Sequence, residues 1–145
     1  MSSVVDSWAS SEHARRTMRA NRRRDTGPEM RIRRALHQKG LRYFVDRAPI
    51  RGLRRRADLV FSKARIAVFI DGCFWHGCPL HFVEPKTNVD YWKAKIDRNV
   101  IRDRETDSRL NAEGWLVIRI WEHERTAAAV DRIIAAWSRR RRQLD

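Results

Sequence analysis

The chain has 145 residues, of which 42% are apolar and 34% are charged, and this is enough for one domain with a single hydrophobic core. No apolar run reaches the roughly 18–20 residues of a membrane-spanning helix, and the first residues lack the basic start and apolar stretch of a secretory signal. We therefore expect an intracellular, cytoplasmic protein, in which Cys73 and Cys78 are thiols or metal ligands rather than a disulfide.

Positive charge is the strongest global feature of the composition. Lysine and arginine total 32 residues against 18 acids, which gives a net charge of +14 and an isoelectric point near 11.3. The clusters lie at Arg22, Arg23 and Arg24, at Arg54–Arg56 and at Arg139–Arg142. The guanidinium group of arginine can form two hydrogen bonds to one phosphate group, so the expected partner is a polyanion, most commonly nucleic acid. A membrane surface would require a basic amphipathic helix with an apolar side, and the clusters are not arranged in that way.

The first predicted elements are helices. Residues 12–20 indicate a short basic helix. Thr26 and Glu29 then have the spacing of a capping box, in which a threonine hydroxyl accepts a hydrogen bond at the start of a helix. A second helix is therefore predicted over residues 27–39, and Gly40 is suited to end it.

Three strands are predicted next. Alternating apolar residues from Leu41 to Val45 indicate the first, ADLVF opens the second with Asp58, and RIAVFID ends the third at Asp71. A tight turn between the last two strands would bring both carboxylates to one edge of a sheet. Paired carboxylates suit Mg²⁺, which can polarise a phosphodiester and activate a water. Aspartate beside a strand is also ordinary turn chemistry.

The second half of the chain predicts a long helix, a strand and a final helix. Asp90 is suited to cap a helix that runs to about Glu113, with the side chains on one face at Trp92, Ile96, Val100 and Asp103. WLVIRIW has the continuous apolar character of a strand buried on both faces. AAAVDRIIAAW indicates the last helix, followed by a frayed basic tail. The whole pattern predicts one α/β domain over residues 1–145, with a core at about 12–137 and flexible ends.

The segment DGCFWHGCPLH crowds metal-capable side chains and large rings together. Cys73, Cys78 and His81 have the short spacing of zinc ligands. A fourth ligand could be His76 in the same segment or His123 further along the chain. If His123 closes the site, His76 is left as an acid or base with a near-neutral titration range. The neighbouring rings of Phe74 and Trp75 are either core residues or wedges that enter DNA between bases.

Several longer stretches occur in an order that is typical of one family. They are MRANRRRDTGPEMRIRRALHQKGLRY, ADLVF, VFIDGCFWHGCP and NVDYWKAKIDRNVIRDRETDSRLNAEGWLVIRIWEHE. Together they resemble the very short patch repair (Vsr) DNA mismatch endonucleases over about residues 15–137. The resemblance implies a restriction-endonuclease-like α/β fold, with a central mixed sheet flanked by helices, and a structural zinc site. It also implies a Mg²⁺-dependent nick in one strand beside a T:G mismatch.

The resemblance assigns roles to individual residues. The principal metal-binding aspartate corresponds to Asp58 and the catalytic histidine to His76, while the acids that act through water correspond to Glu29 and Asp103. The Ile70 carbonyl would help to hold Mg²⁺. Asp71, where a readily compared member of the family has a histidine, could add another carboxylate ligand. The aromatic residues that wedge into DNA correspond to Phe74, Trp75 and Trp92. The resemblance favours zinc on Cys73, Cys78, His81 and His123, which leaves His76 free for catalysis.

The expected partner is therefore double-stranded DNA that contains a mismatch, bound by a bacterial, nucleoid-associated protein that is monomeric and assisted by mismatch-repair proteins. Two other functions fit the same residues. One is a related nuclease of a defence or restriction system without strict mismatch preference. The other is a non-catalytic, zinc-stabilised DNA-binding module, against which the paired carboxylates of Asp58 and Asp71 argue, because a pure binder gains nothing from acids that face phosphate.

Overall fold

The computed structural model describes residues 26–72 and 87–144 of the chain. The helices and strands in these ranges are α2 (Gly27–Gln38), β1 (Phe44–Arg47), β2 (Ala57–Phe61), β3 (Ile66–Asp71), α3 (Val89–Ala112), β4 (Leu116–Trp121) and α4 (Thr126–Leu144). None of these helices is both long enough and apolar enough to cross a bilayer. The predicted helix at residues 12–20 lies outside the described residues.

The four strands form one mixed sheet in the order β1-β2-β3-β4. β1 and β3 each run antiparallel to β2, while β4 runs parallel to β3 after the crossover through α3. The predicted mixed sheet flanked by helices is therefore confirmed. β1 begins at Phe44 rather than at the predicted Leu41, which is buried in the core before the strand starts.

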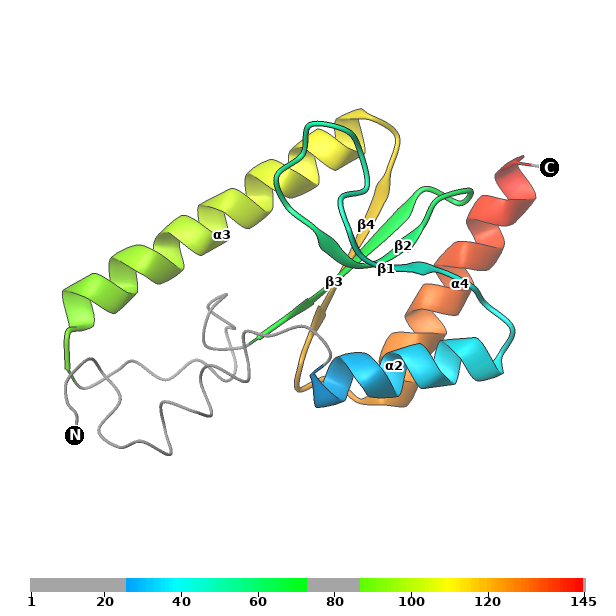
Figure 1. Ribbon diagram of the computed structural model, residues 1–145, viewed down its shortest axis with the longest axis horizontal. Coiled ribbons are helices and arrows are strands. Elements are labelled where there is room, and N and C mark those ends of the chain that lie inside the picture. The colour runs from blue at the N-terminus through cyan, green and yellow to red at the C-terminus, as the bar shows by residue number, and fades with distance from the viewer. Residues whose placement is uncertain (1–25, 73–86, 145) are drawn as a thin grey trace.

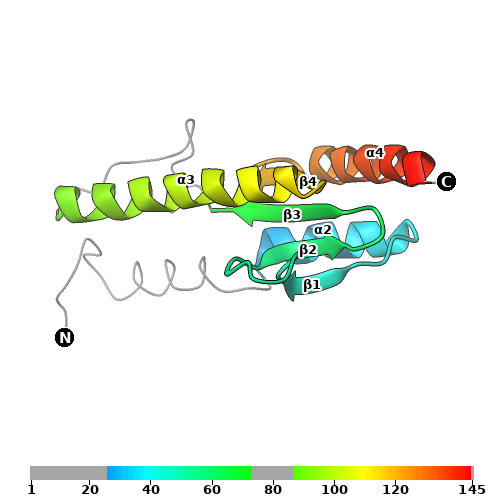
Figure 2. The same cartoon turned by 90° about the horizontal axis from the view of Figure 1, so that it is seen from above.

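Helices cover both faces of the sheet (Figures 1 and 2). One face packs against α2 and α4 in a core that includes Leu36, Leu59, Ile66, Val68, Ile120 and Ile133. The other face packs against α3 in a smaller core that includes Val60, Phe69 and Leu110. The N-terminal part of α3 extends past the end of the sheet, beyond the last residues of β3.

The position of β4 corrects the prediction of a strand buried on both faces. β4 is the last strand in the sheet order, and within it only Ile118 and Ile120 are fully buried. These two residues face the core under α2 and α4, as strand alternation requires. The opposite face of β4 carries Arg119, a charged residue that the apolar composition of the strand concealed.

The predicted ends of α2 and the predicted end of α3 are confirmed, whereas the start of α3 and the end of α4 differ from the predictions. The Thr26 hydroxyl accepts a hydrogen bond from the Glu29 N–H at 3.4 Å, as the capping box requires. In α3 the N-cap is Asn88 rather than the predicted Asp90, and its φ of 52° is a left-handed conformation that asparagine tolerates well. Asp90 lies in the first turn, where its charge favours the helix dipole.

The basic run Arg139–Arg142 is part of α4 and is not the frayed tail that the sequence suggested. The guanidinium group of Arg140 donates hydrogen bonds to the carbonyl oxygens of Ala64 at 2.8 Å and Gly114 at 2.6 Å, which lie in the turns before β3 and β4. The guanidinium of Arg141 lies 5.5 Å from the ring centre of Trp137. These contacts give the helix end tertiary partners, which explains its order.

Candidate active site at the end of the sheet

Asp58 lies near the start of β2, at the end of the sheet where β3 finishes. Its Oδ2 accepts a hydrogen bond from the backbone N–H of Ile70 at 2.6 Å, so the two predicted strand ends do meet. The pKa of Asp58 is raised to about 7, chiefly by burial and also by the negative charges of Glu29 and Asp71, while the Ile70 hydrogen bond and the positive charge of Arg33 act in the opposite direction. Among the described residues, no arginine, lysine or histidine forms an ion pair with Asp58.

Glu29 reaches the same place from the first turn of α2. It is 5% exposed, and its carboxylate pairs with Arg33 at 2.8 Å, one helical turn further on. Its backbone N–H is satisfied by Thr26, so the local cap and the position near Asp58 are compatible. The conflict between a capping role and a site role for Glu29 therefore disappears, because its backbone N–H donates to the Thr26 cap while its carboxylate lies near enough to Asp58 to raise the pKa of that group.

Asp71 ends β3 with its carboxylate buried and paired. The two Oδ atoms lie 3.1 Å from Nη1 of Arg119 on the neighbouring strand. Arg119 also donates to Asp107 of α3 at 2.8 Å and 3.0 Å, and its guanidinium lies 4.2 Å from the ring centre of Phe69. Burial alone would lower the pKa of Arg119, but the Asp107 hydrogen bond and the charges of Asp71 and Asp103 raise it.

Asp103 lies on the face of α3 that the sequence predicted, together with Trp92 and Ile96. Its Oδ1 is 3.7 Å from both Arg119 Nη1 and Arg55 Nη2. The structure thus brings Asp58, Glu29 and Asp71 to one end of the sheet and joins Asp103 to them through Arg119. In residues 26–72 and 87–144, however, no group of three or more histidine, cysteine or acidic side chains is arranged to hold a metal ion.

The aromatic residues at the start of α3 differ in exposure. The indole of Trp92, predicted to enter DNA, is buried with 6% exposure, and the ring of Tyr91 meets it edge to face at 4.9 Å. Tyr91 itself is 56% exposed. Insertion of Trp92 between bases would therefore require this ring to be uncovered first.

Comparison with known proteins identifies the family. The family model described as "DNA mismatch endonuclease Vsr" matches residues 6–81. The chain is 41% identical over 109 residues to the DNA mismatch endonuclease Vsr of Escherichia coli (strain K12), covering 74% of this chain and 67% of that protein. The chain belongs to the Vsr family.

Other relatives in this comparison are named as nicking enzymes. The chain is 47% identical over 122 residues to the type II nicking enzyme V.NaeI of Lentzea aerocolonigenes, covering 82% of this chain and 73% of that enzyme. It is 39% identical over 115 residues to V.NmeDIP of Neisseria meningitidis serogroup C, covering 78% and 76%. This Vsr-family protein is therefore a DNA endonuclease.

Many of the predicted site residues of this Vsr endonuclease lie outside the described residues. They are the predicted base His76, the zinc ligands Cys73, Cys78 and His81, the wedge residues Phe74 and Trp75, and the basic cluster Arg22, Arg23 and Arg24. The remaining zinc candidate, His123, follows β4 and is exposed. Asp71 and Trp121 are paired at the ends of β3 and β4, and the Glu122 N–H donates to the Asp71 carbonyl at 3.0 Å. His123 thus follows the strand that adjoins the one leading in sequence to Cys73.

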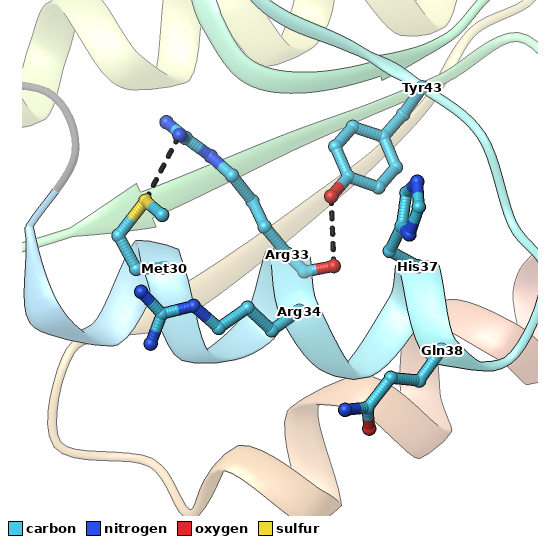
Figure 3. A pocket seen from close by; sticks show the side chains of 6 residues that line it. All are labelled: Met30, Arg33, Arg34, His37, Gln38 and Tyr43. Atoms are coloured by element: carbon cyan, nitrogen blue, oxygen red, sulfur yellow. Dashed lines mark hydrogen bonds between the residues drawn. The ribbon is translucent and has the colours of Figure 1, made fainter.

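A basic hollow of about 400 Å³ lies beside α2, the helix that carries Glu29. Figure 3 shows the lining side chains, which are Met30, Arg33, Arg34, His37, Gln38 and Tyr43. The Tyr43 hydroxyl donates to the Arg33 carbonyl at 2.8 Å and so ties the segment before β1 to the helix. Arg34 is exposed and has no ion-pair partner among the described residues. The hollow therefore presents the cationic side chain of Arg34 on the outside of the Vsr domain.

Sequence reasoning missed Arg119 and Arg33, which organise the acids of the site. A usable signal existed for Arg119, because a lone arginine inside LVIRIW is charged and half-buried and such a group needs acidic partners. Asp107, one helical turn after Asp103, supplies one of them. Arg33 lies one turn after Glu29, and this spacing is typical of an ion pair on a helix.

Proposed function

We propose that this Vsr-family endonuclease nicks one strand of duplex DNA beside a T:G mismatch in a Mg²⁺-dependent reaction. The observation that carries the proposal is the Asp58 carboxylate, which is buried beside two further acids without an arginine partner in the described part of the chain. A negative group in that situation favours a bound cation, and the family supplies the DNA substrate.

The residues present fit Mg²⁺ as the cation. Mg²⁺ keeps several of its waters and commonly takes only one or two carboxylates from a protein, so Asp58 with the Ile70 carbonyl is a sufficient donor set. When bound, the ion would stabilise negative charge on the phosphate and lower the pKa of water. Glu29 orients the attacking water in this proposal, and His76 accepts its proton. Asp103 acts indirectly, through Arg119.

A cleavage assay on matched duplexes tests this proposal. Otherwise identical duplexes carry either a T:G or a T:A pair, and each is incubated with Mg²⁺ or with EDTA. We expect a nick in one strand of the T:G duplex with Mg²⁺, and little cleavage of the T:A duplex or without the ion. Cleavage that is unaffected by removal of divalent cations would refute the metal-dependent mechanism.

The names of the relatives favour a second candidate function. Five of the curated relatives are called type II nicking enzymes, so a nuclease attached to a restriction system remains the alternative. It would use the same Asp58 and His76 chemistry but would nick T:G and T:A duplexes at comparable rates when the flanking sequence is right. A non-catalytic DNA-binding module is not supported, because the family consists of endonucleases. Assistance by mismatch-repair proteins and a monomeric state stay predictions.

The mismatch preference is attributed to aromatic insertion. A mismatched step costs less to unstack than a paired one, so rings that enter there bind it preferentially. We assign this role to Phe74 and Trp75, with Trp92 as a further ring once it is uncovered. Equal loss of affinity for T:G and T:A duplexes in a Trp75→Ala variant would count against the assignment.

A structural zinc ion on Cys73, Cys78, His81 and His123 is the second metal that we propose. The pairing of Asp71 with Trp121 supports it, because His123 follows the strand that adjoins the one leading to Cys73. A His123→Ala variant is expected to lose most of its zinc, measured by metal analysis of the purified protein, whereas His76→Ala is expected to retain it. Loss of zinc from His76→Ala alone would instead place His76 in the zinc site.

The basic hollow beside α2 is expected to contact the DNA backbone. Reversing the charge of its exposed arginine, in Arg34→Glu, should weaken binding of T:G and T:A duplexes equally, by roughly 10-fold at low salt, and should reduce the salt dependence of binding. Fluorescence anisotropy at several salt concentrations measures both effects.

Lys63→Glu is the matched control for this prediction. Lys63 is exposed in the turn between β2 and β3, at the opposite end of the sheet from Asp58, and its variant makes the same change of charge. Equal weakening by Arg34→Glu and Lys63→Glu would show that only net charge matters and that the hollow has no special part in DNA binding.

A further inference from the structure

We propose that Arg119 is a positioning residue that keeps Asp71 out of the metal coordination shell, so that Asp58 is the carboxylate offered to the divalent cation. The inference rests on the proposed function, since it concerns the same metal site. It removes Asp71 from the set of ligands suggested by the sequence, and it gives Arg119 a function in the chemistry of the site.

The contacts of Asp71 carry the first step. Both of its carboxylate oxygens lie 3.1 Å from the same guanidinium nitrogen of Arg119, and the Asp71 side chain is only 8% exposed. A buried carboxylate whose two oxygens already face a cation gains little from exchanging it for a second one. Asp58 differs, because its carboxylate accepts a hydrogen bond from a neutral backbone N–H, that of Ile70, at 2.6 Å.

The contacts of Arg119 fix the position of its positive charge. Nε and Nη2 hold Asp107 on α3 at 3.0 Å and 2.8 Å, and the face of the guanidinium lies 4.2 Å from the Phe69 ring centre. Phe69 and Arg119 are also direct partners in the parallel pairing of β3 with β4. The guanidinium is thus held along one edge by Asp107 and on one face by Phe69, and its Nη1 is directed at Asp71 with Asp103 at 3.7 Å.

The local charge balance carries the third step. Among residues 26–72 and 87–144, ion pairs link the three negative charges of Asp71, Asp103 and Asp107 to the two positive charges of Arg119 and Arg55. Without Arg119 only the Arg55 pair with Asp103 would offset these three carboxylates, so the net negative charge around Asp71 would rise and a divalent cation would be attracted more strongly. Arg119 therefore occupies the position where a competing cation would be favoured.

Cation binding without DNA tests the inference. Thermal unfolding is followed while Ca²⁺, a non-catalytic substitute, or Mg²⁺ is added to the zinc-loaded protein, and the half-saturating concentration is read for each variant. We expect Asp71→Asn to stay within about twofold of the unmodified protein, because Asp71 is not a ligand. Arg119→Met should lower the half-saturating concentration by about tenfold by releasing the acids, and Arg119→Lys should restore much of the original value.

The variants also separate the possible failures. Asp58→Asn should raise the half-saturating concentration by at least about tenfold; if it has no effect, the proposed metal site itself is wrong. If Asp58→Asn and Asp71→Asn weaken cation binding equally, Asp71 is a ligand and the inference is overturned. Asp131→Asn, at an exposed position on α4, controls for the change in net charge.

A double variant addresses folding. If Arg119→Met does not fold, Asp71→Asn decides the question alone, since Arg119 keeps its contacts with Asp107 and Asp103 in that variant. If Arg119→Met folds, the gain in cation affinity should shrink in Arg119→Met combined with Asp71→Asn, because the carboxylate that was released is gone. An undiminished gain would show that Arg119 does not act through Asp71.

Discussion

Asp58→Asn is expected to reduce strand cleavage by at least about 1000-fold, which corresponds to roughly 4 kcal/mol of lost transition-state stabilisation. The reason is the position of Asp58, which is the acid at the end of the sheet that has no arginine partner in the described part of the chain. Asparagine has nearly the same shape and keeps an oxygen that can accept the Ile70 N–H, so the hydrogen bond between β2 and β3 survives. Single-turnover nicking of a T:G duplex measures the loss.

DNA affinity is the internal control for this prediction. Binding of the same duplex in the absence of divalent cations should be unchanged or slightly tighter, because the variant removes a negative charge near the phosphates. Asp131→Asn removes a charge of the same sign from α4 and should cleave at the normal rate. Cleavage by Asp58→Asn within tenfold of the normal rate would exclude Asp58 as the principal metal ligand.

Local signals in the sequence predicted the part of the site that is built from elements adjacent in the chain, namely β2 and β3. The hairpin of β2 and β3 was predictable because two apolar runs are joined by a short turn, and this alone brings Asp58 to the end of β3. The position of α2 followed similarly from its threonine cap and from Gly40, whose φ of 90° is a conformation that favours glycine.

The arginines could not be placed by the same reasoning, because their partners come from distant elements. Asp71 and Arg119 are 48 residues apart and meet only because α3 returns the chain parallel to β3. The periodicity of apolar residues does not reveal this strand order. For the same reason it predicted that the strand over WLVIRIW is buried on both faces, whereas β4 is the edge strand of the sheet. A pattern of apolar residues shows which face of a strand is buried, but it does not show which charged residue of a distant element will pair with a charge on the other face.

The stability of the protein should depend on pH through Asp58, and Asp58→Asn should abolish this dependence. Burial raises the pKa of the folded group to about 7 from 3.8, so between these values the unfolded chain has released a proton that the folded chain still holds. Stability therefore falls as pH rises from about 4 to 7 and stays low above that range, because the folded protein must then carry a buried, unpaired negative charge.

The asparagine variant should accordingly be more stable than the unmodified protein by on the order of 2–4 kcal/mol at pH 8 without added Mg²⁺, and by much less at pH 5. Chemical denaturation at both values measures the difference. Added Mg²⁺ should stabilise the unmodified protein more at pH 8 than at pH 5, since the cation competes with the proton for one carboxylate, and should barely affect the variant. A stability difference that is the same at both pH values would show that Asp58 titrates normally, so that its carboxylate is ionised at both pH values and burial does not penalise its charge.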